Sequence, residues 1–141
     1  MRHRRLSSAI AVLIVLFANV ALAQPVGTLS ELMSRVLYPM ADAVFYIETR
    51  TPTTEVEWNE LRTKTLLLAE SANLLLMPAH MRDDKQWVED AKLLRDAGAA
   101  AYKAAKAKDV PALQALNDQL YQSCVQCHAH YRKNYGKGRR P

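Results

Sequence analysis

The chain has 141 residues, of which 50% are hydrophobic and 23% are charged, and its formal net charge is +5 at pH 7. This length indicates one domain with a modest core rather than several domains. Alanine and leucine are abundant while glycine is scarce, so the composition favours helices. The sequence contains no internal repeat and no low-complexity linker, which excludes repeat architectures.

We expect residues 1–23 to be a cleaved secretory signal peptide and residues 24–141 to be the mature domain. A basic start precedes an almost wholly apolar run over residues 9–23, which ends in the small-x-small pattern of a cleavage site. The run is shorter than the ~20 residues that span a bilayer, which argues against a retained anchor. Cleavage removes three arginines and no acidic residue, so the formal net charge falls from +5 to +2. The basic composition is therefore no argument for nucleic-acid binding.

Two helices are predicted in the first half of the mature domain. The first covers about residues 29–48, and Pro39 should bend it near residues 36–38 because proline removes one backbone hydrogen bond. The second starts at the capping box Thr54-Glu55-Val56-Glu57 and ends at Pro78. The expected apolar seam of the first helix is Leu29, Met33, Val36, Met40, Ala43 and Ile47, and that of the second is Trp58, Leu61, Thr65, Leu68, Ala72 and Leu75.

Two more helices are predicted in the second half. Asp83 or Asp84 caps the third, which runs to about Lys108, and Asp109 caps the fourth, which ends before Gly136. The third seam has one large residue followed by small ones, which indicates either close helix packing or space for a flat cofactor. Four amphipathic helices with short connections predict an all-α antiparallel four-helix bundle. The third seam is Trp87, Ala91, Leu94, Gly98, Ala101 and Ala105, and the fourth is Leu113, Leu116, Leu120, Cys124, Cys127 and Tyr131.

The stretch Cys124-Val125-Gln126-Cys127-His128 is a Cys-x-x-Cys-His motif, which is typical of c-type haem attachment. The thiols form thioethers with the porphyrin vinyl groups, and the adjacent imidazole takes one axial position on the iron. Positions 124, 127 and 128 share one face of a helix because they are spaced i,i+3 and i,i+4. We therefore predict one haem c, bound covalently through Cys124 and Cys127, with His128 as the proximal iron ligand.

Three other interpretations of the motif are weaker. A structural zinc site needs four ligands, usually two such cysteine pairs, but Cys124 and Cys127 are the only cysteines. A thioredoxin-like redox pair would lie beside a βαβ pattern, and no strand-rich segment is present. A plain disulfide in an exported protein gives His128 no role.

The chain resembles the class II c-type cytochromes, which comprise cytochrome c′ and its low-spin relatives. The resemblance covers about residues 28–135 and comes from the four predicted helices, the haem motif near the C-terminus and its continuation Cys-His-Ala-His-Tyr-Arg at residues 127–132. The run Leu-Met-Ser-Arg-Val-Leu-Tyr-Pro-Met-Ala-Asp at residues 32–42 is similar to the methionine-ligated subgroup. The resemblance implies a haem inside the bundle, with the first helix on its distal side. Together with the export signal, it implies a periplasmic protein.

Met33 separates two expected functions. The resemblance implies that Met33 is the distal iron ligand, in which case the protein is an electron-transport cytochrome and not an enzyme. Alternatively Met33 only fills a gap in the core, the iron is five-coordinate, and the protein binds nitric oxide or carbon monoxide. Met40, two turns along the same face, is the competing ligand. A peroxidatic enzyme would need a distal acid or base, which the first helix does not offer.

Several other residues have expected positions. Arg132 resembles the family's basic residue after the motif and is either a haem-pocket contact or a solvated cation. Trp87 and Tyr131 are expected to be core aromatics near the porphyrin, while His80 and His130 are expected at the surface.

The expected partners are transient redox proteins, and the resemblance also implies a homodimer through the first two helices. A basic cluster near the C-terminus either steers an acidic redox partner or is a solvated tail. This cluster is Lys133, Lys137, Arg139 and Arg140.

Overall fold

The computed structural model describes residues 24–83 and 85–136, and every regular element in these ranges is a helix. The predicted signal peptide lies outside the described residues, as do Asp84 and residues 137–141. The elements are α2 (Leu29–Glu31), the π-helix η1 (Leu32–Leu37), α3 (Tyr38–Phe45), α4 (Glu55–Leu74), α5 (Gln86–Ala107), α6 (Val110–Ala115) and α7 (Asn117–Tyr131).

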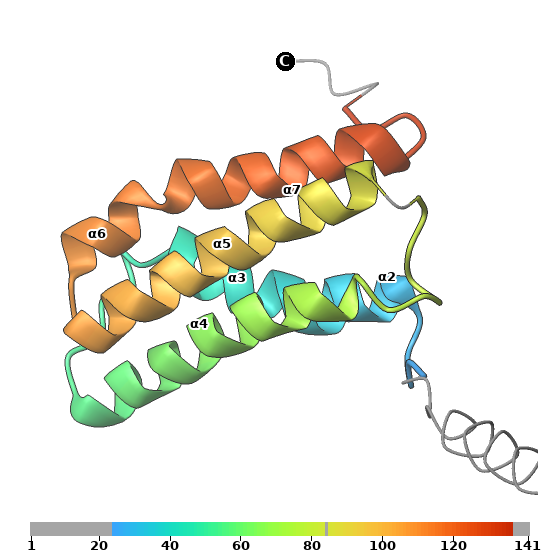
Figure 1. Ribbon diagram of the computed structural model, residues 1–141. Coiled ribbons are helices and arrows are strands. Elements are labelled where there is room, and N and C mark those ends of the chain that lie inside the picture. Colours follow the sequence, from blue (N-terminus) through green and yellow to red (C-terminus); the bar gives the residue numbers. More distant parts are fainter. Residues whose placement is uncertain (1–23, 84, 137–141) are drawn as a thin grey trace, which may run out of the picture.

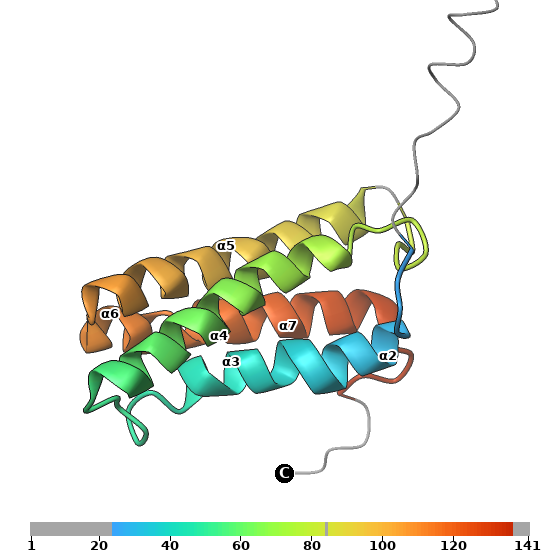
Figure 2. The ribbon, with the colours of Figure 1, turned by 90° about the horizontal axis from the view of Figure 1, so that it is seen from below.

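These elements form four helical segments that lie side by side, with each segment running opposite to the one before it (Figures 1 and 2). The first segment is α2–η1–α3, the second is α4, the third is α5, and the fourth is α6–α7. The prediction of an all-α fold with four packed helices is thereby confirmed. Within the described part of the chain, no helix is both long enough and apolar enough to cross a bilayer.

A π turn interrupts the first segment directly before Pro39. The N–H of Tyr38 donates to the carbonyl of Met33, five residues back, instead of the usual four. Pro39 has no N–H, so the backbone ladder also loses a donor at the next position. The bend predicted near residues 36–38 stays a prediction, while the structure shows a π-helix over residues 32–37, directly before Pro39.

The π turn also shows that the predicted seam of the first segment was wrong in part. Leu32 and Leu37, five positions apart, are both buried, and the five-residue turn between them brings them closer to one face than a regular α-helix would. Met33 and Met40 are only half-buried and pack against the edge of the core. The buried residues of this segment and the turn after it are Leu32, Leu37, Ala41, Val44 and Ile47.

The pair α4 and α5 forms the tightest part of the core, and every residue of both predicted seams is buried. A Cβ atom added to Gly98 would lie 2.8 Å from the backbone nitrogen of Ala69 and 2.9 Å from its Cα. The small residues of α5 therefore serve close helix packing, and the cofactor-space interpretation fails at Gly98. Nearer the connection between the two helices, Trp87 Nε1–H donates to the carbonyl of Leu75 at 2.6 Å.

The fourth segment was predicted as one helix but is divided at Leu116. Asp109 caps α6 as expected, because its carboxylate accepts the N–H of Ala112 at 2.9 Å. Leu116 has φ −82° and ψ −10°, and its N–H donates to Leu113, three residues back. At the other end α7 stops at Tyr131, before the expected limit, because Arg132 has an extended backbone.

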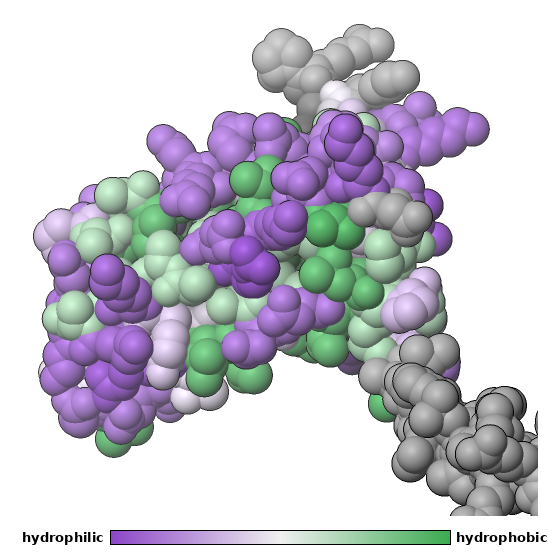
Figure 3. Space-filling view, in the orientation of Figure 1, coloured by the Kyte–Doolittle hydropathy of each residue, from purple (hydrophilic) through white to green (hydrophobic). Residues whose placement is uncertain are grey.

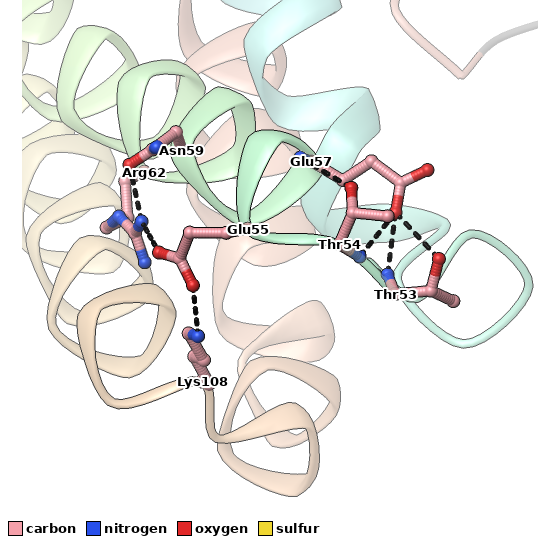
Figure 4. A network of polar contacts seen from close by, with 7 residues as sticks. All are labelled: Thr53, Thr54, Glu55, Glu57, Asn59, Arg62 and Lys108. Carbon is pink, nitrogen blue, oxygen red and sulfur yellow. Dashed lines mark hydrogen bonds and ion pairs between the residues drawn. The ribbon is translucent and has the colours of Figure 1, made fainter.

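Two acidic residues anchor the start of α4 (Figure 4). Glu57 accepts the N–H groups of Thr53 and Thr54 at 2.7 and 2.9 Å, while its own N–H donates to Thr54 Oγ1, which completes the predicted capping box. These hydrogen bonds lower the pKa of Glu57 to about 2. Glu55 pairs with Arg62 and with Lys108, so the start of α4 is tied to the end of α5.

Substitution Gly98→Ala should destabilise the protein. Alanine gains about 1 kcal/mol of helix propensity over glycine, but its methyl group would meet the α4 backbone at Ala69, which cannot rotate away. We expect a net loss of about 1–2 kcal/mol in the free energy of unfolding, measured by chemical denaturation. The control Ala99→Ser, at the neighbouring exposed position, should change it by less than ~0.5 kcal/mol. An unchanged or higher stability of Gly98→Ala would contradict the close contact.

Glu57→Gln should lower stability in a pH-dependent way. The folded-state pKa of Glu57, about 2, lies below its ordinary value of 4.5, so the ionised carboxylate stabilises the fold above pH 4.5. This contribution disappears as the pH falls towards 2. The melting temperature of Glu57→Gln should therefore lie below that of the unsubstituted protein at neutral pH and converge with it near pH 2. Glu60→Gln, exposed on the same helix, is the matched control, and a difference for Glu57→Gln that is independent of pH would refute the assignment.

Candidate functional site

A cavity of about 530 Å³ lies between the first segment and the end of α7. Met33 enters its wall from η1, Trp87 from the start of α5, and His128 from α7. The ends of these elements meet at one end of the molecule, where α2 and the last turn of α7 lie (Figure 1). Cofactor sites commonly occupy about 300–1,000 Å³ and are mostly apolar with a few polar groups, so this cavity is of suitable size.

The structure brings together two of the sequence-predicted ligands. Met33 and His128 come from the first and last helical segments, yet both line this cavity. Met40 instead packs against the hydrophobic core and does not belong to the cavity wall. A thioether and an imidazole facing one cavity are the donor pair of a His/Met-ligated haem iron.

The two cysteines of the motif are free thiols on α7, both half-buried. Cys127 packs against the hydrophobic core, and neither cysteine belongs to the cavity wall. Burial raises the pKa of Cys124, while burial and the charge of Asp90 raise the pKa of Cys127 to about 11. Both side chains are therefore protonated thiols at neutral pH, and they lie beside His128 as the motif predicts.

The imidazole of His128 is held in a state suitable for metal binding. Burial, and then the positive charge of Arg132, lower its pKa below the ordinary value. A neutral imidazole is the form that ligates a metal. Tyr135 packs edge-on against it, with ring centroids 5.2 Å apart.

Arg132 lies in the cavity wall, as the haem-pocket interpretation requires. Its guanidinium lies 5.5 Å from the ring centroid of Tyr135, and the backbone N–H of Arg132 donates to the carbonyl of His128 at 2.9 Å. Arg132 therefore remains close to His128 although it follows the end of the helix. A role in holding a cofactor stays a prediction.

An aromatic pair completes the cavity wall. The rings of Trp87 and Tyr131 meet edge to face, with centroids 4.8 Å apart, and both line the cavity. The hydroxyl of Tyr131 donates to the carboxylate of Asp83, whose other oxygen accepts the N–H groups of Lys85 and Trp87 at 3.1 Å each. The N-cap position of α5 is Lys85, without a side-chain cap, so the cap predicted at Asp83 is wrong in position. Asp83 instead accepts N–H groups at the start of the helix from two residues farther out, and it also orients the tyrosine.

The two histidines that were predicted to lie at the surface differ in the structure. His80 was wrongly predicted: it is 6% exposed, and its ring nitrogens lie 2.8 and 3.5 Å from the carbonyl oxygens of Leu74 and Gly27. The turn after α4 folds against the start of the first segment, so the buried ring lies within reach of both carbonyl oxygens. His130 is exposed as expected, but its Nδ1 donates to Asp90 at 2.7 Å.

Asp90 was missed by the sequence analysis. It is 2% exposed, and its position in the sequence gave a usable signal, because it lies three residues after Trp87 and four before Leu94 on the buried face of α5. An acidic residue at such a position requires a polar partner from another element.

In the described ranges, no group of three or more histidine, cysteine or acidic side chains could hold a bare metal ion. Haem iron needs only its axial ligands from the protein, because the porphyrin supplies the other four nitrogens. The neutral imidazole, the thioether and the apolar aromatic wall of the cavity therefore fit a haem group, and the two thiols lie on α7 within one turn of the imidazole but outside the wall.

The chain matches no known family model, no curated protein and no solved structure.

Proposed function

We propose that the protein is a periplasmic monohaem c-type cytochrome that carries electrons, with a four-helix bundle around the haem and His128 and Met33 as axial ligands. The observation that carries this proposal is the shared cavity. Met33 and His128 lie near opposite ends of the mature chain, and in the fold both line the same cavity of about 530 Å³. A cavity formed only by packing gives no reason for this pairing.

The haem would be held by residues of the cavity wall and by two cysteines of α7 outside it. Cys124 and Cys127, which do not belong to the wall, would attach the haem covalently, and His128, which does, would bind the iron. Trp87 and Tyr131 give an apolar aromatic surface, and their contact with each other and with Asp83 fixes their orientation. The haem would supply a one-electron ferric/ferrous couple, and the surrounding side chains would exclude water and set its potential.

The donor pair favours electron transfer over the two other interpretations. A methionine ligand closes the sixth position and raises the potential relative to two histidines. Gas binding would need Met33 to be absent from the iron or easily displaced. A peroxidatic reaction would need a distal acid or base, but among the described residues the cavity wall contains no carboxylate, and its one imidazole is His128. We therefore propose a carrier that transforms no substrate.

The surface supports two kinds of partner. Arg82 and Arg132 line the cavity and are exposed, and Lys133 is exposed beside them, so this end of the molecule would attract an acidic redox protein. The remaining basic residues of the predicted cluster lie outside the described residues. Hydrophobic side chains also gather among hydrophilic ones on the face shown in Figure 3. The exposed leucines of α4, which support the proposed homodimer, are Leu66, Leu67 and Leu74.

The absorption spectrum of the protein expressed in a periplasm with haem-attachment machinery tests the proposal. The intact mass should exceed that of the mature chain by one haem. The ferric and ferrous spectra should be low-spin, with a methionine-to-iron charge-transfer band, and carbon monoxide should not change the ferrous spectrum. Met33→Ala should abolish the band completely and give a high-spin protein that binds carbon monoxide.

Met40→Ala is the matched control, since Met40 is a half-buried methionine of the same segment outside the cavity wall. This variant should keep the low-spin spectrum. If Met40→Ala abolishes the band instead, the ligand assignment is wrong. If the unsubstituted protein has a high-spin spectrum and binds carbon monoxide, gas binding is its function and not electron transfer. If it carries no covalent haem, both functions are refuted.

A further inference from the structure

A buried carboxylate lies next to the proposed haem site and has no role in the function proposed above. Asp90 of α5 is 2% exposed, and both of its oxygens accept hydrogen bonds. His130 Nδ1 donates to one oxygen at 2.7 Å, and the side-chain amide of Gln86 donates to the other at 3.2 Å. A carboxylate that accepts at both oxygens is bonded as an ionised group. Burying such a group is costly unless it is paired, so its presence requires an explanation.

The position of Asp90 places its charge close to the cavity. It lies one helical turn after Trp87, which lines the cavity, and its partner His130 is two residues after His128 on α7. Its negative charge also raises the pKa of Cys127 and of Tyr131, after burial and, for Tyr131, the bond to Asp83. The field of Asp90 therefore reaches both the attachment segment and the aromatic wall.

We propose that Asp90 sets the reduction potential of the haem: its fixed negative charge stabilises the more positive, oxidised state and so lowers the potential. This inference depends on the function proposed above. Reduction adds one electron from a partner protein and makes the site more negative by one charge. A buried anion opposes that change, and no other bond is formed or broken.

The positive charges at the cavity do not cancel this effect. Arg82 and Arg132 are exposed, so water and salt screen their fields strongly. Asp90 is almost completely shielded from water, and a charge in such surroundings acts at a lower effective dielectric constant. His130 holds the carboxylate in place and ties the attachment segment of α7 to α5.

Redox titration of the haem-loaded protein at neutral pH tests the proposal. Asp90→Asn has nearly the same shape and removes the charge, although its amide nitrogen cannot accept one of the two hydrogen bonds. We expect the ferric/ferrous ratio at a fixed applied potential to fall about tenfold, which is a rise of about 59 mV for a one-electron couple. Asp96→Asn, the same substitution at an exposed position of α5, should leave the potential within a few millivolts because solvent screens that site.

A folded, haem-loaded Asp90→Asn with an unchanged or lower potential overturns the proposal. If Asp90→Asn does not fold, the reduction potential of His130→Gln tests the proposal instead. This variant keeps the carboxylate of Asp90 but removes the imidazole that donates to it. A lower potential in His130→Gln supports the proposal, and an unchanged or higher one refutes it. A failure of the proposed cytochrome function would be distinguishable from a failure of this inference, because the unsubstituted protein would then carry no covalent haem.

Discussion

The hydrogen bond from Tyr38 to Met33 sets the register of the whole first segment. Because this hydrogen bond spans five residues, the turn contains one residue more than a turn of α-helix. The residues after the turn are therefore rotated about the helix axis relative to those before it. Leu37, Ala41 and Val44 consequently face the core, while Met33 stays at the edge of the core and in the cavity wall. In a regular helix Met33 would lie between Leu32 and Leu37 around the axis, whereas the wider turn leaves it at the edge of the face that these leucines bury. Pro39 favours this arrangement because it has no N–H to continue the ordinary ladder.

The cavity also depends on how unevenly the four segments pack. Gly98 lets α5 approach the backbone of α4 at Ala69, so this pair forms a dense layer without room for a bulky group. At the start of α5, by contrast, lies the large residue Trp87, whose indole is fixed by the carbonyl of Leu75 and by the ring of Tyr131. The cavity lies where the start of α5 meets the first segment and the end of α7.

The sequence was sufficient for α4 and α5, because a regular 3.6-residue period and a capping box are local properties. Trp58 to Leu75 and Trp87 to Ala105 follow that period, and all members of both seams are buried. The first segment could not be predicted fully, since a π turn breaks the period and no residue type requires one. His80 and Asp90 were missed for a different reason. The partner of Asp90 comes from α7, which neighbouring residues cannot identify, although its position on the buried face of α5 indicated its burial. The ring of His80 lies between the carbonyl of Leu74 and that of the distant Gly27.

The same distinction applies to the site. Cys124, Cys127 and His128 lie within one and a half turns of a helix, so the proposed haem attachment and the proposed first axial ligand would be encoded locally. The proposed second axial ligand, Met33, comes from η1, and its position depends on a turn, a helix register and the packing of two segments. Attachment should therefore tolerate changes elsewhere in the fold, whereas ligation by Met33 should not. Because the sixth ligand separates electron transfer from gas binding, substitutions in η1 can change the function of such a protein while its haem motif stays intact.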